Sequence, residues 1–128
     1  DRRIHLSEVS LELINELEEL EPFGKGNPTP VFAEKNIQIC DIKILGKNQN
    51  TLKLTCIIHN NSKIDAICFN RVEDFKELLK ERYENNYEKV LINPLGLKLD
   101  IIFYPMINDF NGTRKLQLRI KDFRLSTN

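Results

Sequence analysis

The stretch that decides the fold reads Leu52-Lys53-Leu54-Thr55-Cys56-Ile57-Ile58-His59-Asn60-Asn61-Ser62-Lys63-Ile64-Asp65-Ala66-Ile67-Cys68-Phe69. Apolar and polar residues alternate on both sides of Asn60-Asn61-Ser62, the period of two that is typical of half-buried β-strands. A three-residue loop would put only apolar residues on the inward face, pairing Ile58 with Ile64, Cys56 with Ala66 and Leu54 with Cys68. A two-residue loop would mix the faces, because a slip of one residue turns every side chain over. The pattern therefore predicts a β-hairpin with a three-residue loop.

The segment before this hairpin predicts a long first strand with a bulge. Ile37 and Ile39, and then Ile42 and Ile44, alternate with polar residues, but the phase changes at Cys40-Asp41. An extra residue in one strand produces such a change and bends the strand.

Two more strands are predicted near the end of the chain. Apolar residues recur at every second position over 97–103, and Pro105 is expected to end that strand. A loop at 108–112 contains the Asn-Gly pair, a strong turn signal. The last strand, over 116–125, has a phase shift at Lys121-Asp122.

Between the third and fourth strands, Val72, Phe75 and Leu79 follow helical spacing and predict a helix over 73–83. Residues 87–92 are expected to form a short strand or extended link. The order β-β-β-α-β-β predicts a mainly β fold, the five-stranded barrel called the OB-fold. An open α+β sheet with the same order of elements is the alternative.

The first thirty residues predict a helix followed by an elbow. Apolar residues recur at helical spacing over 7–20. The segment 21–30 contains three of the five prolines, so a regular element cannot pass through it. We expect two units, a connecting helix at 1–21 and an elbow with the OB-fold domain at 22–128.

Composition is typical of one globular domain. The chain has 128 residues, of which 41% are hydrophobic and 30% charged, and no apolar run is long enough to span a membrane. We expect a cytoplasmic protein with no membrane partner. Residues 1–21 hold seven acidic and two basic residues, whereas 22–128 hold twelve acidic and seventeen basic residues, so a mildly basic body carries an acidic appendage.

No catalytic or metal-binding constellation can be recognised in the sequence. Cys40, Cys56 and Cys68 lie in apolar runs without metal spacing and are interpreted as core residues. The two histidines lack a cluster of ligands around them. Gly24-Lys25-Gly26 is not followed by the Ser or Thr and helix of a phosphate loop. We therefore expect that this fragment is not an enzyme by itself and has no cofactor.

The outward face of the hairpin is the first candidate binding site. In the predicted register Lys53 lies opposite Phe69, so a cation and a base-stacking aromatic would be neighbours. OB-folds bind oligonucleotides on this face. The alternative is that Ile67 and Phe69 point outward only to pack beneath a helix.

The second candidate site is the last loop and the strand after it. Phe110 and Asn111 occupy the loop, and an aromatic residue there can stack on a base. The candidate phosphate contacts are the basic residues that follow, Arg114, Lys115, Arg119 and Lys121.

Three blocks of the sequence together resemble the C-terminal region of the RecJ family of single-stranded-DNA-specific exonucleases. The blocks are Leu20-Glu21-Pro22-Phe23-Gly24-Lys25-Gly26-Asn27-Pro28-Thr29-Pro30-Val31-Phe32, Ala66-Ile67-Cys68-Phe69, and Asn108-Asp109-Phe110-Asn111-Gly112 with the following Leu116-Gln117-Leu118-Arg119-Ile120-Lys121-Asp122. The family carries Trp in many members at the loop position where this chain has Phe110.

The resemblance implies a longer parent enzyme, used in DNA repair and recombination, that digests single strands from 5′ to 3′. Its DHH core and DHHA1 domain would precede this fragment, and the core would hold two metal ions, Mg²⁺ or Mn²⁺. Single-stranded DNA, the missing core and replication or repair proteins are the implied partners. The alternative is a structural or protein-interaction module that scaffolds the core or docks partners. A free-standing enzyme of another type is the third possibility, against which the lack of a catalytic constellation stands.

Overall fold

The computed structural model describes residues 2–3, 31–58 and 61–127. The predicted helix at 7–20 and the elbow at 21–30 lie outside the described residues, so the predicted division into two units remains a prediction. No helix within the described part of the chain is long and apolar enough to cross a membrane.

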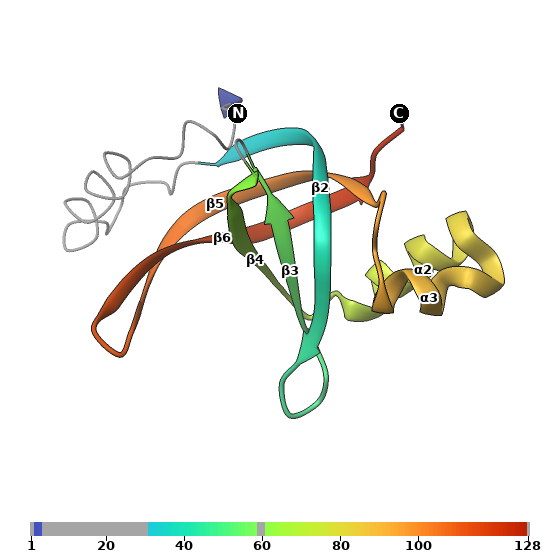
Figure 1. Ribbon diagram of the computed structural model, residues 1–128, viewed down its shortest axis with the longest axis horizontal. Helices are drawn as coiled ribbons and strands as arrows, with labels where there is room; N and C mark the ends of the chain where they lie inside the picture. Colours follow the sequence, from blue (N-terminus) through green and yellow to red (C-terminus); the bar gives the residue numbers. More distant parts are fainter. Residues whose placement is uncertain (1, 4–30, 59–60, 128) are drawn as a thin grey trace.

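Five strands close into a barrel (Figure 1). They are β2 (Phe32–Leu45), β3 (Thr51–Ile57), β4 (Lys63–Phe69), β5 (Lys98–Phe110) and β6 (Thr113–Leu125). Their order is β2-β3-β4-β6-β5, and β5 returns to pair with β2, while a short β1 (Arg2–Arg3) lies parallel to β2. This closure confirms the predicted OB-fold and excludes the open sheet.

The inward residues form one continuous core. Most buried residues of the barrel strands alternate with less buried ones, because successive side chains point to opposite faces. The fully buried set includes Leu52, Leu54, Cys56, Ala66, Leu99, Phe103 and Leu118. The predicted inward face of each strand is therefore correct.

Bulges let the strands bend around this core, and one of them, in β2 between Glu34 and Ile37 where it pairs with β5, was not predicted. The pairing of β2 with β3 shifts between Ile39 and Asp41, which confirms the bulge predicted at Cys40-Asp41. In β6, Ile120 pairs with Phe103 and Asp122 with Ile102, so Lys121 is the extra residue. Both phase changes in the sequence thus mark points of barrel curvature.

The register of the hairpin between β3 and β4 differs from the prediction by two residues. Cys56 pairs with Ile64 rather than Ala66. The Ile58 amide donates to the Ser62 carbonyl at 2.7 Å, so Ile58 lies opposite Ser62 and not opposite Ile64. A shift of two residues keeps every side chain on its face, so the hydrophobic pattern could not detect it.

Helices cover one end of the barrel (Figure 1). The predicted helix is α2 (Val72–Tyr83), with Phe75 and Leu79 fully buried in the core. A short 3-10 helix η4 (Glu84–Asn86) leads to α3 (Tyr87–Ile92), so the strand or extended link predicted there is wrong. Tyr87, Val90 and Leu91 have the spacing of one helical face and pack against the core.

The hairpin of β5 and β6 is longer than predicted. Pro105 pairs with Leu118 inside β5 instead of ending it, and the strand continues to Phe110. Pairing between β5 and β2 stops at Phe103, so β6 is the only strand neighbour of position 105 among the described residues. Proline is tolerated there because a free edge needs no donor.

Only two residues form the turn at the end of this hairpin. Asn111 and Gly112 both have positive φ, 50° and 77°. This is the conformation of a type I′ turn, for which Asn-Gly is the preferred sequence. The hairpin beyond the barrel, residues 104–116, is called the arm below, and it projects away from α2 and α3 (Figure 1).

Candidate nucleic-acid interface

The side chains that alternate with the core form an outer face across three neighbouring strands. We define the outer face as Thr51, Lys53, Thr55, Asp65, Ile67, Phe69, Gln117 and Arg119. Within it, Lys53 lies opposite Ile67, and Ile67 lies opposite Arg119. The outer face therefore has a cationic side chain on each side of its central strand, β4.

Phe69 is the exposed aromatic residue of this face. Its side chain is 47% exposed, and the Arg119 guanidinium carbon lies 4.6 Å from the centre of its ring. A cation over an aromatic face is attracted by the ring quadrupole and holds the ring in place. The remaining exposed surface of the ring can accept a base by stacking.

The Arg119 side chain is partly buried, although its guanidinium lies over the half-exposed Phe69 ring. Its Nε is buried and has no hydrogen-bond partner within the described residues. The barrel brings Arg119 to Phe69 because β4 and β6 pair in parallel. Two residues predicted separately from sequence are thus one unit in the structure.

Lys53 occupies a different place from the predicted one. It lies opposite Ile67, and Thr51 takes the position opposite Phe69. Lys53 Nζ is 3.7 Å from Asp65 Oδ2, a contact that sequence reasoning did not anticipate. The predicted pairing of Lys53 with Phe69 is wrong because of the two-residue shift in register, although both residues remain on the outer face.

The two outward apolar residues of β4 differ in exposure. Ile67 is 8% exposed yet does not belong to the barrel core cluster. Phe69 on the same strand remains about half exposed. The two outward apolar residues therefore differ in what they can do, since only Phe69 offers accessible ring surface.

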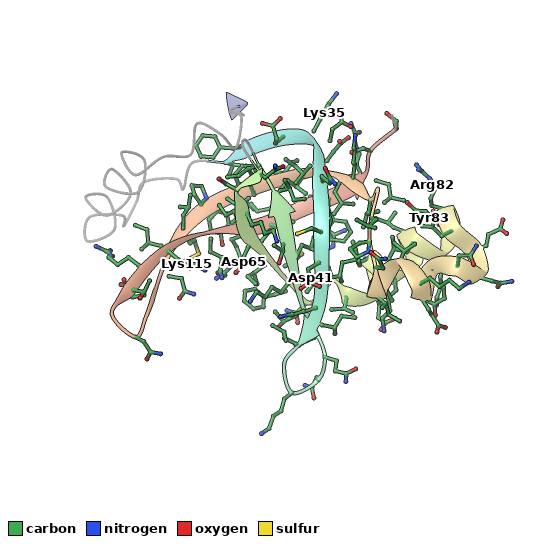
Figure 2. The ribbon with its side chains drawn as sticks, in the orientation of Figure 1. Lys35, Asp41, Asp65, Arg82, Tyr83 and Lys115 are labelled. Atoms are coloured by element: carbon green, nitrogen blue, oxygen red, sulfur yellow. The ribbon has the colours of Figure 1, made fainter. Side chains whose placement is uncertain are left out.

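The other predicted residues lie along β6 and the arm. Lys115 is exposed on the arm, on the side of the molecule away from Arg82 and Tyr83 of the helical region (Figure 2). Lys115 and Arg119 share a face of β6, because they are four residues apart in a strand. Lys121 is exposed at the bulge.

The tip of the arm contains Phe110, Asn111 and Arg114. Phe110 pairs with Thr113 through the backbone, and Asn111 is exposed in the turn. Arg114 alternates with Lys115 to the opposite face of the arm, and its Nε is 3.0 Å from Asp109 Oδ1. The structure thus separates Arg114 from the group formed by Lys53, Phe69 and Arg119.

Several charges elsewhere on the described surface are already paired. Arg124 Nε lies 2.9 Å from Asp100 Oδ2, and Arg71 Nη1 lies 2.7 Å from Asp122 Oδ1. The hydrogen bond from Arg71 holds the pKa of the Asp122 carboxyl below its usual value. Lys115 and Lys121 form no ion pair with any residue in the described ranges, so they remain available to an anion.

Sequence reasoning missed two neighbours of the site. Lys43 lies directly opposite Lys53 on β2, and half-buried Tyr104 lies opposite Arg119 on β5. Both follow from alternation once the inward residues are assigned.

Two of the three cysteines are core residues, as predicted, whereas Cys40 lies at the bulge of β2 and outside the core cluster. Cys56 and Cys68 are buried and reduced, and Cys40 is half-buried. Burial raises the pKa of the Cys56 thiol to about 12, so it stays protonated at neutral pH. Within the described part of the chain, no group of three His, Cys, Asp or Glu side chains could hold a metal ion.

A closed five-stranded barrel with a capping helix and a basic, aromatic outer face defines this chain as an OB-fold domain. Residues 1–122 match the family described as the RecJ OB domain, and the chain belongs to that family. The chain is 31% identical over 121 residues to the single-stranded-DNA-specific exonuclease RecJ of Bacillus subtilis. That match covers 94% of this chain but only 13% of the relative, so the chain spans a small part of its length.

Two solved structures are also similar. One is the mitochondrial single-stranded-DNA-binding protein Rim1 of Saccharomyces cerevisiae, with a TM-score of 0.48 and 14% identity. The match covers 77% of this chain and 96% of Rim1. The other is yeast RPA bound to single-stranded DNA, with a TM-score of 0.41 and 13% identity, covering 88% of this chain and 86% of that one.

Proposed function

We propose that this chain is the single-stranded-DNA-binding module of a longer RecJ-type exonuclease. The observation that carries the proposal is the half-exposed Phe69 ring held beneath the Arg119 guanidinium on a sheet face that also presents Lys53. Every base has a π-face and every phosphate has a charge, so this combination binds a single strand without reading its sequence. Membership of the RecJ OB domain family supports the same function.

The two contributions differ in how they respond to salt. Stacking of one base is worth about 1 to 3 kcal/mol and depends little on ionic strength. Phosphate contacts by Lys53, Lys115, Arg119 and Lys121 would give a slope of log affinity against log salt of about −3, at roughly −0.7 per contact on a single strand. The isolated module therefore binds modestly and is sensitive to salt.

In this proposal, the remainder of the longer protein carries out hydrolysis. The remainder would contain the DHH core and its Mg²⁺ or Mn²⁺, and would degrade the strand from its 5′ end during repair and recombination in the cytoplasm. The module would hold the strand while the core cuts it. The relative's name, single-stranded-DNA-specific exonuclease, supports the assignment of binding to this module and of hydrolysis to the core.

A docking role is the second candidate function. Ile92 of α3 and Leu95 in the turn after it are 84% and 76% exposed, and large aliphatic residues exposed so close together are typical of protein contacts. They lie at the helical end of the barrel, away from the arm (Figure 1). The module could therefore contact the nuclease core or another protein there without using the outer face.

Titration of the chain with a fluorescent single-stranded oligothymidine separates the two functions. We expect binding that weakens steeply between low and moderate salt, with weaker binding of the matching duplex. Absence of binding even at low salt would contradict the proposed DNA-binding function and favour the docking role.

A further inference from the structure

Asp65 is the acidic residue of the outer face, and it lies at the centre. On β4 it is opposite Thr55 of β3 on one side and opposite Gln117 of β6 on the other. It is two residues from Ile67 and four from Phe69 on the same face of the strand. A negative charge is therefore built into the surface that is proposed to bind a polyanion.

The Asp65 carboxylate has two contacts with β3. Its Oδ2 is 3.7 Å from Lys53 Nζ, and its Oδ1 accepts a hydrogen bond from the Thr55 hydroxyl at 3.4 Å. The Lys53 and Asp65 side chains are 31% and 30% exposed. Solvent and salt screen such partly covered charges less than fully exposed ones.

Lys43 gives the carboxylate a further role. It lies directly opposite Lys53 on β2, and like charges in that position repel each other. Asp65 offsets this repulsion while the face is free. The same side chain must oppose an incoming phosphate, which carries the same charge and uses the same ammonium group.

We propose that Asp65 competes with the DNA phosphate for Lys53 and so limits the affinity of the outer face for a single strand. The inference rests on the proposed function and assigns a specific residue to the control of its strength. A phosphate beside Lys53 displaces the carboxylate but remains near it, and their repulsion offsets part of the attraction to Lys43 and Lys53. The resulting weak hold allows the strand to move across the module, while stacking of bases on Phe69 keeps the strand bound to the outer face.

Asp65→Asn tests the proposal because the amide has the shape of the carboxylate and can still accept the Thr55 hydrogen bond. We expect oligothymidine to bind the variant roughly three- to tenfold more tightly at low salt. The salt slope should become steeper by about 0.7, as for one additional fully neutralised phosphate. In a Lys53→Met background, most of the gain should disappear, since the two residues act as a pair.

Glu88→Gln is the matched control, because it removes one negative charge from exposed α3, away from the outer face. An equal gain in that variant would overturn the proposal by showing an effect of net charge alone. Unchanged or weaker binding by Asp65→Asn, with wild-type binding intact, would overturn the inference and leave the proposed function standing. If neither protein binds, the proposed function fails as well. Asp65→Ser provides a second neutral variant should the Asn variant unfold.

Discussion

At the scale of single residues, Phe69 and Arg119 contribute to the proposed binding in different ways: Phe69 offers a ring for stacking, and Arg119 supplies positive charge. Arg119 lies over the ring at 4.6 Å, so its guanidinium both orients the aromatic and adds positive charge beside it. Phe69 is 47% exposed, so little of the barrel's stability depends on it. The two residues can therefore be substituted to test binding without disrupting the packing of the core.

Phe69→Ala should weaken oligothymidine binding by roughly 5- to 100-fold, the equivalent of one lost base stack. The salt slope should stay unchanged because no charge is removed. Fluorescence titration at several salt concentrations measures both quantities. Ile92→Ala, which truncates an exposed residue on α3, is the control and should bind as the wild type does. A Phe69→Ala variant with wild-type affinity would rule out stacking on this ring.

Charge reversal should abolish binding. Lys53→Glu combined with Arg119→Glu replaces two cations of the outer face by anions, so the phosphate attraction becomes repulsion. Circular dichroism should show an intact fold, because both side chains point away from the core. Lys89→Glu on exposed α3 serves as the comparison for a general change in charge. Retention of affinity by the double variant would place the site elsewhere.

At the scale of elements, α2 closes the end of the barrel with its apolar face. Phe75 is fully buried and meets Phe123 of β6 edge to face, with ring centres 5.8 Å apart. The Arg71 guanidinium carbon lies 4.5 Å from the centre of the Phe123 ring, and Arg71 also pairs with Asp122. The helix is thus joined to β6 close to the bulge that follows Arg119.

Phe75→Ala should lower the free energy of unfolding by about 3 to 5 kcal/mol, since it removes a buried ring and leaves a cavity. Urea unfolding followed by circular dichroism measures the change. Lys76→Ala, on the partly exposed side of the same helix, should cost much less and controls for helix propensity. A small effect of Phe75→Ala would show that the helix does not contribute to the core.

At the scale of the whole molecule, Asp100 connects three parts of the chain. It accepts hydrogen bonds from the Asn36 backbone N–H at 3.0 Å, the Ser126 hydroxyl at 2.7 Å and Arg124 Nε at 2.9 Å. Burial alone would raise the pKa of Asp100, but these hydrogen bonds outweigh burial and hold the pKa below its usual value. Its carboxylate therefore stabilises the closed barrel.

A lowered folded-state pKa makes this stabilisation depend on pH. It is fully present above the unfolded-state pKa of about 4 and is lost as pH falls through the lower folded-state value. Asp100→Asn should therefore destabilise the protein at pH 7, with a difference from wild type that shrinks toward pH 2. Urea unfolding at pH 7, 4 and 2.5 tests this expectation. A difference that stays constant with pH would show that the carboxylate charge is not responsible.

The sequence by itself determined the order of the barrel strands and of α2 along the chain, the inward faces, and the bulges at Cys40 and Lys121, but not the bulge between Glu34 and Ile37. Alternation is a local property, and a phase change at Cys40 or Lys121 is visible without any partner strand. The same pattern identified Phe69 and Lys53 as outward residues. Residues 87–92 were predicted wrongly because a segment of six residues is too short for its period to distinguish helix from strand.

Only the tertiary structure decided which outward residues meet. The hairpin register was open to shifts of two residues, because such shifts leave each side chain on its face. The true register places Lys53 beside Asp65, and barrel closure brings Arg119 over Phe69 from a strand far along the chain. A pattern along one strand specifies the face of a residue, whereas its neighbours across strands depend on how the whole barrel packs.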